Sequence, residues 1–122
     1  MTQEAYCSFE TARLLKEKGF DEPFKDYHYD KEGNRIGYLT PKETYPCPTH
    51  QMAMAWLREV YKLSIEPYSI AIEENCIGYA YAICSCKTGL EIFAERWDGK
   101  NPFVSYEKAV EAALKYTLKN LV

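Results

Sequence analysis

The chain has 122 residues and an apolar fraction of 47%, values that are typical of one folded domain and exclude the disordered and fibrous classes. Its net charge of -3 is spread along the sequence, and no segment concentrates the basic residues that nucleic-acid binding requires. The opening residues lack the basic start and apolar run of a secretory signal. No stretch has the roughly 18 apolar residues of a membrane span, so we expect a cytoplasmic protein without membrane contact.

The first predicted element is a helix over residues 9–18. Ser8 is placed to supply the N-cap side chain, and Gly19 can adopt the positive φ that commonly ends a helix. Glu10 lies in the first turn, where a negative charge favours the helix.

A β-hairpin is predicted next. The runs 24–29 and 35–39 have strand-like patterns, and the turn-forming residues 30–34 join them. Residues 40–48 contain three prolines, which fix the backbone and remove N–H donors. We therefore expect an extended connector between the hairpin and the next helix.

The strongest helix signal covers residues 48–62, and the fold should pack around it. Thr49 is placed as the N-cap, and His50 should face solvent in the first turn. The apolar spacing predicts a buried stripe of Met52, Ala53, Trp56, Leu57 and Val60.

Three β-rich runs follow, at residues 64–72, 76–85 and 90–97. Their short connections predict an antiparallel meander with 76–85 in the centre, and Pro67 places the first run at an edge or a bulge. In the central strand we expect a helix to approach the face of small residues, while the tyrosine-bearing face is partly wet. The first face comprises Gly78, Ala80, Ala82 and Cys84, and the second comprises Ile77, Tyr79, Tyr81 and Ile83.

The last predicted element is a helix from residue 106 to about residue 119, with Ser105 as its N-cap. Its buried stripe should consist of Ala109, Val110, Ala113, Leu114, Thr117 and Leu118. Together the elements predict a single α+β domain over residues 1–122, in the order αββαβββα, with helices packed on an antiparallel sheet.

Five cysteines in a chain with no recognisable secretory signal are more typical of reduced thiols than of a disulfide framework. Cys84 and Cys86 could begin a metal site, and the residues that could complete it are Cys7, Cys47, Cys76, His28 and His50. One residue separates the paired cysteines instead of the usual two, and no second pair exists. We therefore predict no metal and no other cofactor.

A cysteine–histidine pair is the nucleophilic chemistry that the composition allows. No sequence around a cysteine resembles a nucleophile turn, and the six glycines are isolated, so there is no phosphate-binding loop. We predict no catalytic residue. An enzyme would need a pocket that brings His28 or His50 within hydrogen-bond reach of a cysteine or a carboxylate.

Tyrosine is the unusual residue type, with 11 copies, and its apolar body and polar tip suit half-buried surfaces and interfaces. The best candidates for a recognition surface lie in the hairpin and the central strand, namely Tyr27, His28, Tyr29, Tyr38, Tyr79 and Tyr81. Half-buried packing within the sheet is the competing interpretation, and we favour it because aromatic residues are common in strands.

The three predicted helices also carry a resemblance. Residues 8–21, 48–59 and 105–114 resemble, in order and spacing, a family of small uncharacterised proteins of Bacteroides and related gut bacteria. Members of that family are often associated with prophages and other mobile elements. The resemblance implies this setting and a shared scaffold, but it implies no activity, ligand or catalytic residue.

Tyrosine excess without a catalytic motif favours a non-catalytic binding or accessory protein of a phage or mobile element. We expect it to contact an unidentified protein partner, or a second copy of itself, through the aromatic hairpin or an exposed sheet face. The alternative is a nucleic-acid-associated phage protein, which requires a clustered basic face. The third interpretation is a small hydrolase or transferase.

Overall fold

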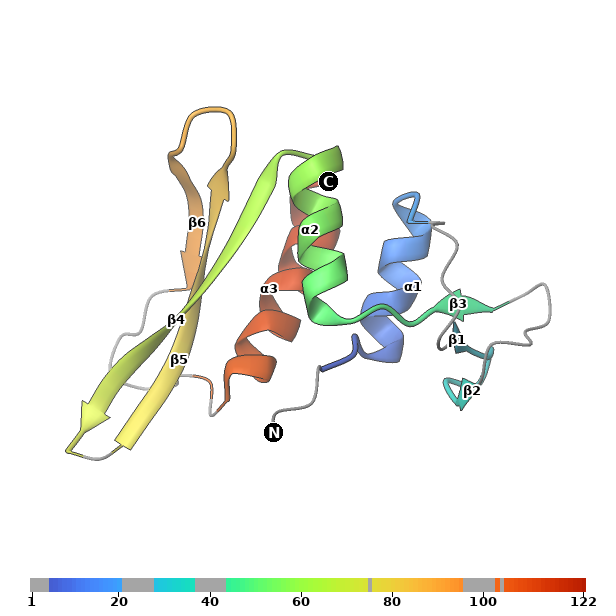
Figure 1. The fold of residues 1–122 in the computed structure, drawn as a ribbon, viewed down its shortest axis with the longest axis horizontal. Coiled ribbons are helices and arrows are strands. Elements are labelled where there is room, and N and C mark those ends of the chain that lie inside the picture. Colours follow the sequence, from blue (N-terminus) through green and yellow to red (C-terminus); the bar gives the residue numbers. More distant parts are fainter. Residues whose placement is uncertain (1–4, 21–27, 37–43, 75, 96–102, 104) are drawn as a thin grey trace.

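The computed structural model describes residues 5–20, 28–36, 44–74, 76–95, 103 and 105–122, and it shows three helices and two antiparallel sheets (Figure 1). The predicted α+β class is confirmed. No helix in these ranges is both long and apolar enough to cross a membrane. The helices are α1 (Phe9–Glu17), α2 (His50–Val60) and α3 (Tyr106–Asn120). The strands are β1 (His28–Tyr29), β2 (Arg35–Ile36), β3 (Tyr45–Pro46), β4 (Leu63–Glu73), β5 (Cys76–Ser85) and β6 (Glu91–Glu95).

All three helices begin at the hydroxyl residues that the sequence predicts. The side chains of Ser8, Thr49 and Ser105 each accept a hydrogen bond from the backbone N–H three residues further on. Gly19 follows α1 with a φ of +102°, a conformation that glycine adopts without strain. Local capping chemistry therefore sets the helix starts.

The larger sheet is the predicted meander, with the strand order β4-β5-β6. The central position of β5 and the edge position of the proline-containing β4 are both confirmed. The prediction that a helix packs on the small-residue face of β5 is wrong. Residues opposite each other in an antiparallel pair share a face, and Ile83 pairs with Ile65 in the core that α3 covers. The helices therefore pack on the face of Tyr81 and Ile83, because these large side chains bury more apolar area than alanines would.

The smaller sheet has the order β2-β1-β3. Within the described residues the hairpin is confirmed, since Tyr29 pairs with Arg35; residues 24–27 and 37–39 of the prediction lie outside them. The connector is more regular than expected, because Tyr45 also pairs with Tyr29 and so forms β3. Pro46 is tolerated there because β3 is an edge strand. The observed order is thus αβββαβββα.

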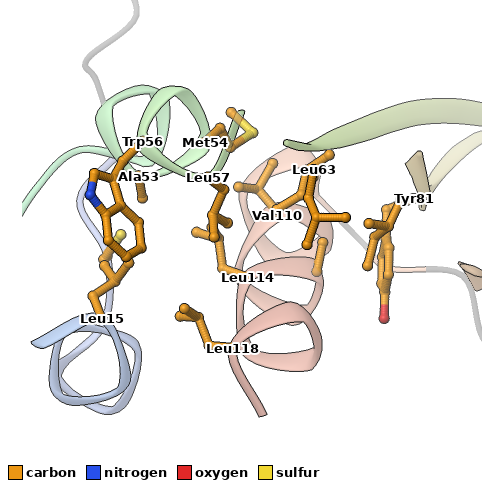
Figure 2. Close-up of a cluster of buried hydrophobic side chains, with 14 of the residues drawn as sticks. Leu15, Ala53, Met54, Trp56, Leu57, Leu63, Tyr81, Val110, Leu114 and Leu118 are labelled. Atoms are coloured by element: carbon orange, nitrogen blue, oxygen red, sulfur yellow. The ribbon is translucent and has the colours of Figure 1, made fainter. Parts of the chain in front are cut away.

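The core lies where α2, α3 and β4–β5 meet, with α1 closing one side (Figure 2). The predicted stripe of α3 is confirmed, as all six of its residues are buried. In α2 the buried arc is shifted: Met54 is buried in place of Met52, and Val60 remains 54% exposed. The reason is that α2 packs between two neighbours. Trp56 contacts Phe20 beside α1 at a ring distance of 5.4 Å, while Leu57 faces α3.

Candidate functional site: a buried cluster and an exposed arm

The N-termini of α1 and α2 are held together by a short antiparallel bridge. The N–H of Cys7 donates to the carbonyl of Pro48 at 2.9 Å, and the N–H of His50 donates to the carbonyl of Ala5 at 2.8 Å. His50 is therefore buried, and the prediction that it faces solvent is wrong. His50 lies on the same face of α2 as Ala53 and Leu57, so its side chain points into the protein.

Glu111 of α3 lies against both helix N-termini. Its Oε1 accepts hydrogen bonds from His50 Nε2 at 2.9 Å and from the backbone N–H of Ser8 at 2.7 Å. Its Oε2 accepts from Ser8 Oγ at 2.9 Å and from Thr11 Oγ1 at 2.7 Å. One carboxylate thus connects all three helices.

These donors decide the ionisation of Glu111. Burial by itself would raise the pKa of the carboxyl, but the hydrogen bonds from His50, Thr11 and Ser8 outweigh it and lower the pKa to about 2. The N-terminal ends of α1 and α2 also favour a negative charge at this position. Glu111 is therefore an anion at neutral pH, with both oxygens paired.

The thiol of Cys7, next to the His50–Glu111 pair, is in contrast uncharged. Cys7 is fully buried, and burial, together with the charge of Glu111 and the neighbouring Cys47, raises its pKa well above the ordinary value of 9.0. Burial also raises the pKa of Cys47, which is fully buried as well. A histidine–carboxylate pair, the first requirement of the enzyme interpretation, is therefore present. The thiol beside it is protonated and sealed from substrate, which is unfavourable for a nucleophile.

The same side chains offer three different ligand atoms. The sulfur of Cys7, a ring nitrogen of His50 and a carboxylate oxygen of Glu111 all lie within 4.8 Å of one another. We call these residues the Cys7–His50–Glu111 cluster. Among the described residues, no group of three or more such ligands includes Cys84 or Cys86.

Only part of this cluster is visible in the sequence. Cys7 and His50 are predicted from the sequence only as supplementary ligands of a cysteine pair, and Glu111 is not predicted as a ligand. That residue lies next to the apolar stripe of α3, where a glutamate is normally solvated. The one sequence feature near Glu111 that can be recognised is the pair of hydroxyl N-caps, Ser8 and Thr49, at the starts of the two helices that meet at Glu111.

The predicted recognition residues fall in different environments. The hydroxyl of Tyr29 donates to the carbonyl of Cys7 at 2.6 Å, and His28 Nδ1 lies 3.0 Å from Thr44 Oγ1. Tyr81 is buried in the core and so does not belong to a surface. Tyr79 is half-buried, in an edge-to-face contact with Tyr106. Tyr27 and Tyr38 lie outside the described residues.

Residues 68–74 and 76–78, at the far end of β4 and β5, form a segment that we call the β4–β5 arm. It extends past α3 as a two-stranded ribbon (Figure 1). Among the described residues, β6 pairs with residues 81–84 of β5, and Phe103 pairs with Tyr79 next to the arm. Tyr68 is 41% exposed and Ile77 is 58% exposed on this arm.

The chain gives no match when it is compared with protein-family models, with curated proteins or with solved structures. No relative therefore supplies a substrate, a ligand or a catalytic residue for the cluster or for the arm. Both features have to be interpreted from their own contacts, burial and charge.

Proposed function

We propose that the protein is a non-catalytic binding or accessory protein that acts through protein–protein contacts made by the β4–β5 arm. The observation that carries this proposal is the exposure of two large apolar side chains, Tyr68 and Ile77, on the paired ends of β4 and β5. The phage or mobile-element setting implied by the sequence resemblance belongs to the same proposal.

The arm has the features of a segment that a partner covers. Among the described residues no third strand pairs with the arm itself, and a two-stranded hairpin is marginally stable in water unless a third strand or a helix supports it. Tyr68 pairs with Ala80, and Ile77 pairs with Ala71. The two pairs are three residues apart along each strand, so the side chains of Tyr68 and Ile77 lie on opposite faces of the ribbon. Both faces thus present a large apolar side chain, which suits insertion into a groove of a protein partner.

The other candidate surfaces are less suitable. In the hairpin, the ring of Tyr29 packs edge-to-face on Phe9 at 5.5 Å and its hydroxyl is bonded to the backbone. This residue therefore holds the fold, in agreement with the packing interpretation. The cluster around His50 has its thiol buried and protonated, which favours a binding protein over a hydrolase or transferase.

The test compares Ile77→Lys with Val60→Lys. Both residues are β-branched and about equally exposed, at 58% and 54%, but Val60 lies on α2 away from the arm. A partner captured from a host lysate is identified by mass spectrometry, purified and titrated against each variant. If the arm is a binding hot spot, Ile77→Lys should weaken the Kd by about 30-fold, corresponding to roughly 2 kcal/mol. Val60→Lys should leave the Kd within about threefold.

Equal binding by both variants would show that the arm is not the contact surface. Retention of nucleic acid that weakens steeply with salt would favour the nucleic-acid alternative instead. Sedimentation of the purified protein distinguishes a homodimer, since self-association through the arm should be lost in Ile77→Lys. A partner encoded far from any mobile element would contradict the proposed setting while leaving the binding function intact.

A further inference from the structure

We propose that Cys7, His50 and Glu111 bind one divalent transition-metal ion, with Zn²⁺ as the best fit. The three residues come from the segment before α1, from the start of α2 and from α3, and their ligand atoms lie within 4.8 Å of one another. This site is independent of the β4–β5 arm and of the partner proposed for it.

The donor set selects the class of ion. A sulfur, an imidazole nitrogen and a carboxylate oxygen are the three donor types that Zn²⁺ takes in proteins, whereas Mg²⁺ and Ca²⁺ require oxygen ligands. Tetrahedral Zn²⁺ with bonds of roughly 2.0–2.3 Å places its ligand atoms roughly 3.3–3.8 Å apart. His50 Nε2 and Glu111 Oε1 are now 2.9 Å apart and would separate by a few tenths of an ångström, whereas ligand pairs that now lie up to 4.8 Å apart would close by up to about 1 Å.

The surroundings of Glu111 hold it in the orientation that a metal ligand needs. When Oε1 binds the ion, Oε2 can keep its hydrogen bonds from Ser8 Oγ and Thr11 Oγ1. Such supporting donors are a regular feature of metal sites, because they fix the carboxylate that binds the ion. Ser8 is the N-cap of α1 and Thr11 lies in its first turn, so both are positioned by the helix itself.

Charge balance favours an occupied site. Glu111 is already an anion, and Cys7 would bind as a thiolate after its S–H bond breaks, an S–metal bond forms and the proton passes to solvent. His50 would bind as the neutral ring with its proton on Nδ1, so that Nε2, which now donates to Glu111, is free to take the ion. Two negative charges and a divalent cation leave the buried site neutral. Three protein ligands leave a fourth position for water, which can enter beside Glu111 because its side chain remains 20% exposed.

A purely structural polar contact is the competing explanation for the same geometry. The hydrogen bonds of Glu111 connect three helices without any help from a sulfur atom. In that explanation Cys7 remains a thiol that fills space and donates a weak hydrogen bond to the carbonyl of Thr49 at 3.9 Å, whereas a metal site requires its thiolate. The experiment therefore centres on Cys7.

The probe is the metal alone, Zn²⁺ or Co²⁺, added to chelator-treated, reduced protein. The wild type should bind one ion per chain, measured by elemental analysis and competition with a chromophoric chelator. Its Co²⁺ form should show sulfur-to-cobalt charge-transfer absorption, and its affinity should rise with pH because Cys7 releases a proton.

The matched variants are Cys7→Ala and Cys47→Ala, since both cysteines are fully buried but only Cys7 belongs to the cluster. Cys7→Ala should lose the charge-transfer band, while Cys47→Ala should keep it. Cys86→Ser, at an exposed thiol, should also keep the band. Thr11→Val removes a supporting donor and should weaken Zn²⁺ binding about 10–100-fold.

Wild-type protein that binds neither ion, or Cys7→Ala protein that keeps the band, would overturn the proposal. Circular dichroism of each metal-free variant shows whether it folds. If Cys7→Ala does not fold, the wild-type cobalt spectrum and its pH dependence still decide whether a thiolate binds the ion.

Discussion

Replacing Glu111 by Gln should destabilise this domain at neutral pH and remove part of its sensitivity to acid. The carboxyl has a pKa of about 2 in the folded protein against an ordinary value of 4.5, as burial is outweighed by its hydrogen bonds. At about 1.36 kcal/mol per pKa unit this difference corresponds to roughly 3 kcal/mol. The side chain is 20% exposed, so solvent screening reduces the expected contribution to about 2 kcal/mol.

The direction of the pH effect follows from the lowered pKa. Folding favours the ionised carboxyl, so its contribution is complete above pH 4.5, the ordinary value, and is lost as the pH falls toward 2. Glu111→Gln has no proton to bind, and its amide also leaves at least one of the former donors without an acceptor. The variant should therefore be less stable than wild type at pH 7, with a difference that shrinks below pH 4.5.

Urea unfolding followed by tryptophan fluorescence at pH 7, 4.5 and 3, with a chelator in every buffer, measures this difference. The chelator removes any contribution of a bound metal. Other carboxylates, including Glu10 and Asp30, are present in both proteins and cancel in the comparison. A stability difference that stays constant from pH 7 to pH 3 would refute the assignment of Glu111 as the buried anion.

Two further predictions test the packing of α2 and the state of the thiols. Leu57→Ala should lower the free energy of unfolding by about 2–5 kcal/mol, because Leu57 is fully buried. Val60→Ala should change it by less than about 0.5 kcal/mol, because Val60 is exposed. Equal losses of stability in urea unfolding would show that Val60 belongs to the core. With a thiol reagent and mass spectrometry of the labelled peptides, Cys86 should react in the folded protein, while Cys7 and Cys47 should react only on unfolding. Rapid labelling of Cys7 in native protein would show that the cluster is open to solvent.

Much of the architecture could be predicted from local chemistry. A hydroxyl followed by an apolar pattern identifies each helix start, as at Ser8, Thr49 and Ser105, because the cap satisfies backbone donors within the same segment. The meander and the edge position of Pro67 follow in the same way from strand patterns and short connections. These features depend on residues that are near each other in the chain.

The faces of the elements are less predictable. Periodicity shows that α2 has a buried side, but the exact arc depends on which neighbours cover it, so Val60 was expected to be buried and Met54 was not. The same limit applies to β5, where both faces are weakly polar and the helices could have packed on either. The side with Tyr81 and Ile83 was selected by the neighbouring β4 and α3.

By itself the sequence determined the element types, their capped starts and the α+β class, because these depend on interactions between near neighbours in the chain. Only the tertiary structure decided that Cys7, His50 and Glu111 meet, since their ligand atoms belong to segments far apart in the sequence. It also decided that Tyr68 and Ile77 of the β4–β5 arm are exposed, while β6 pairs with residues 81–84 of β5 among the described residues. Both candidate sites depend on long-range packing, and hydrophobic periodicity carries no information about which distant segments will pack together.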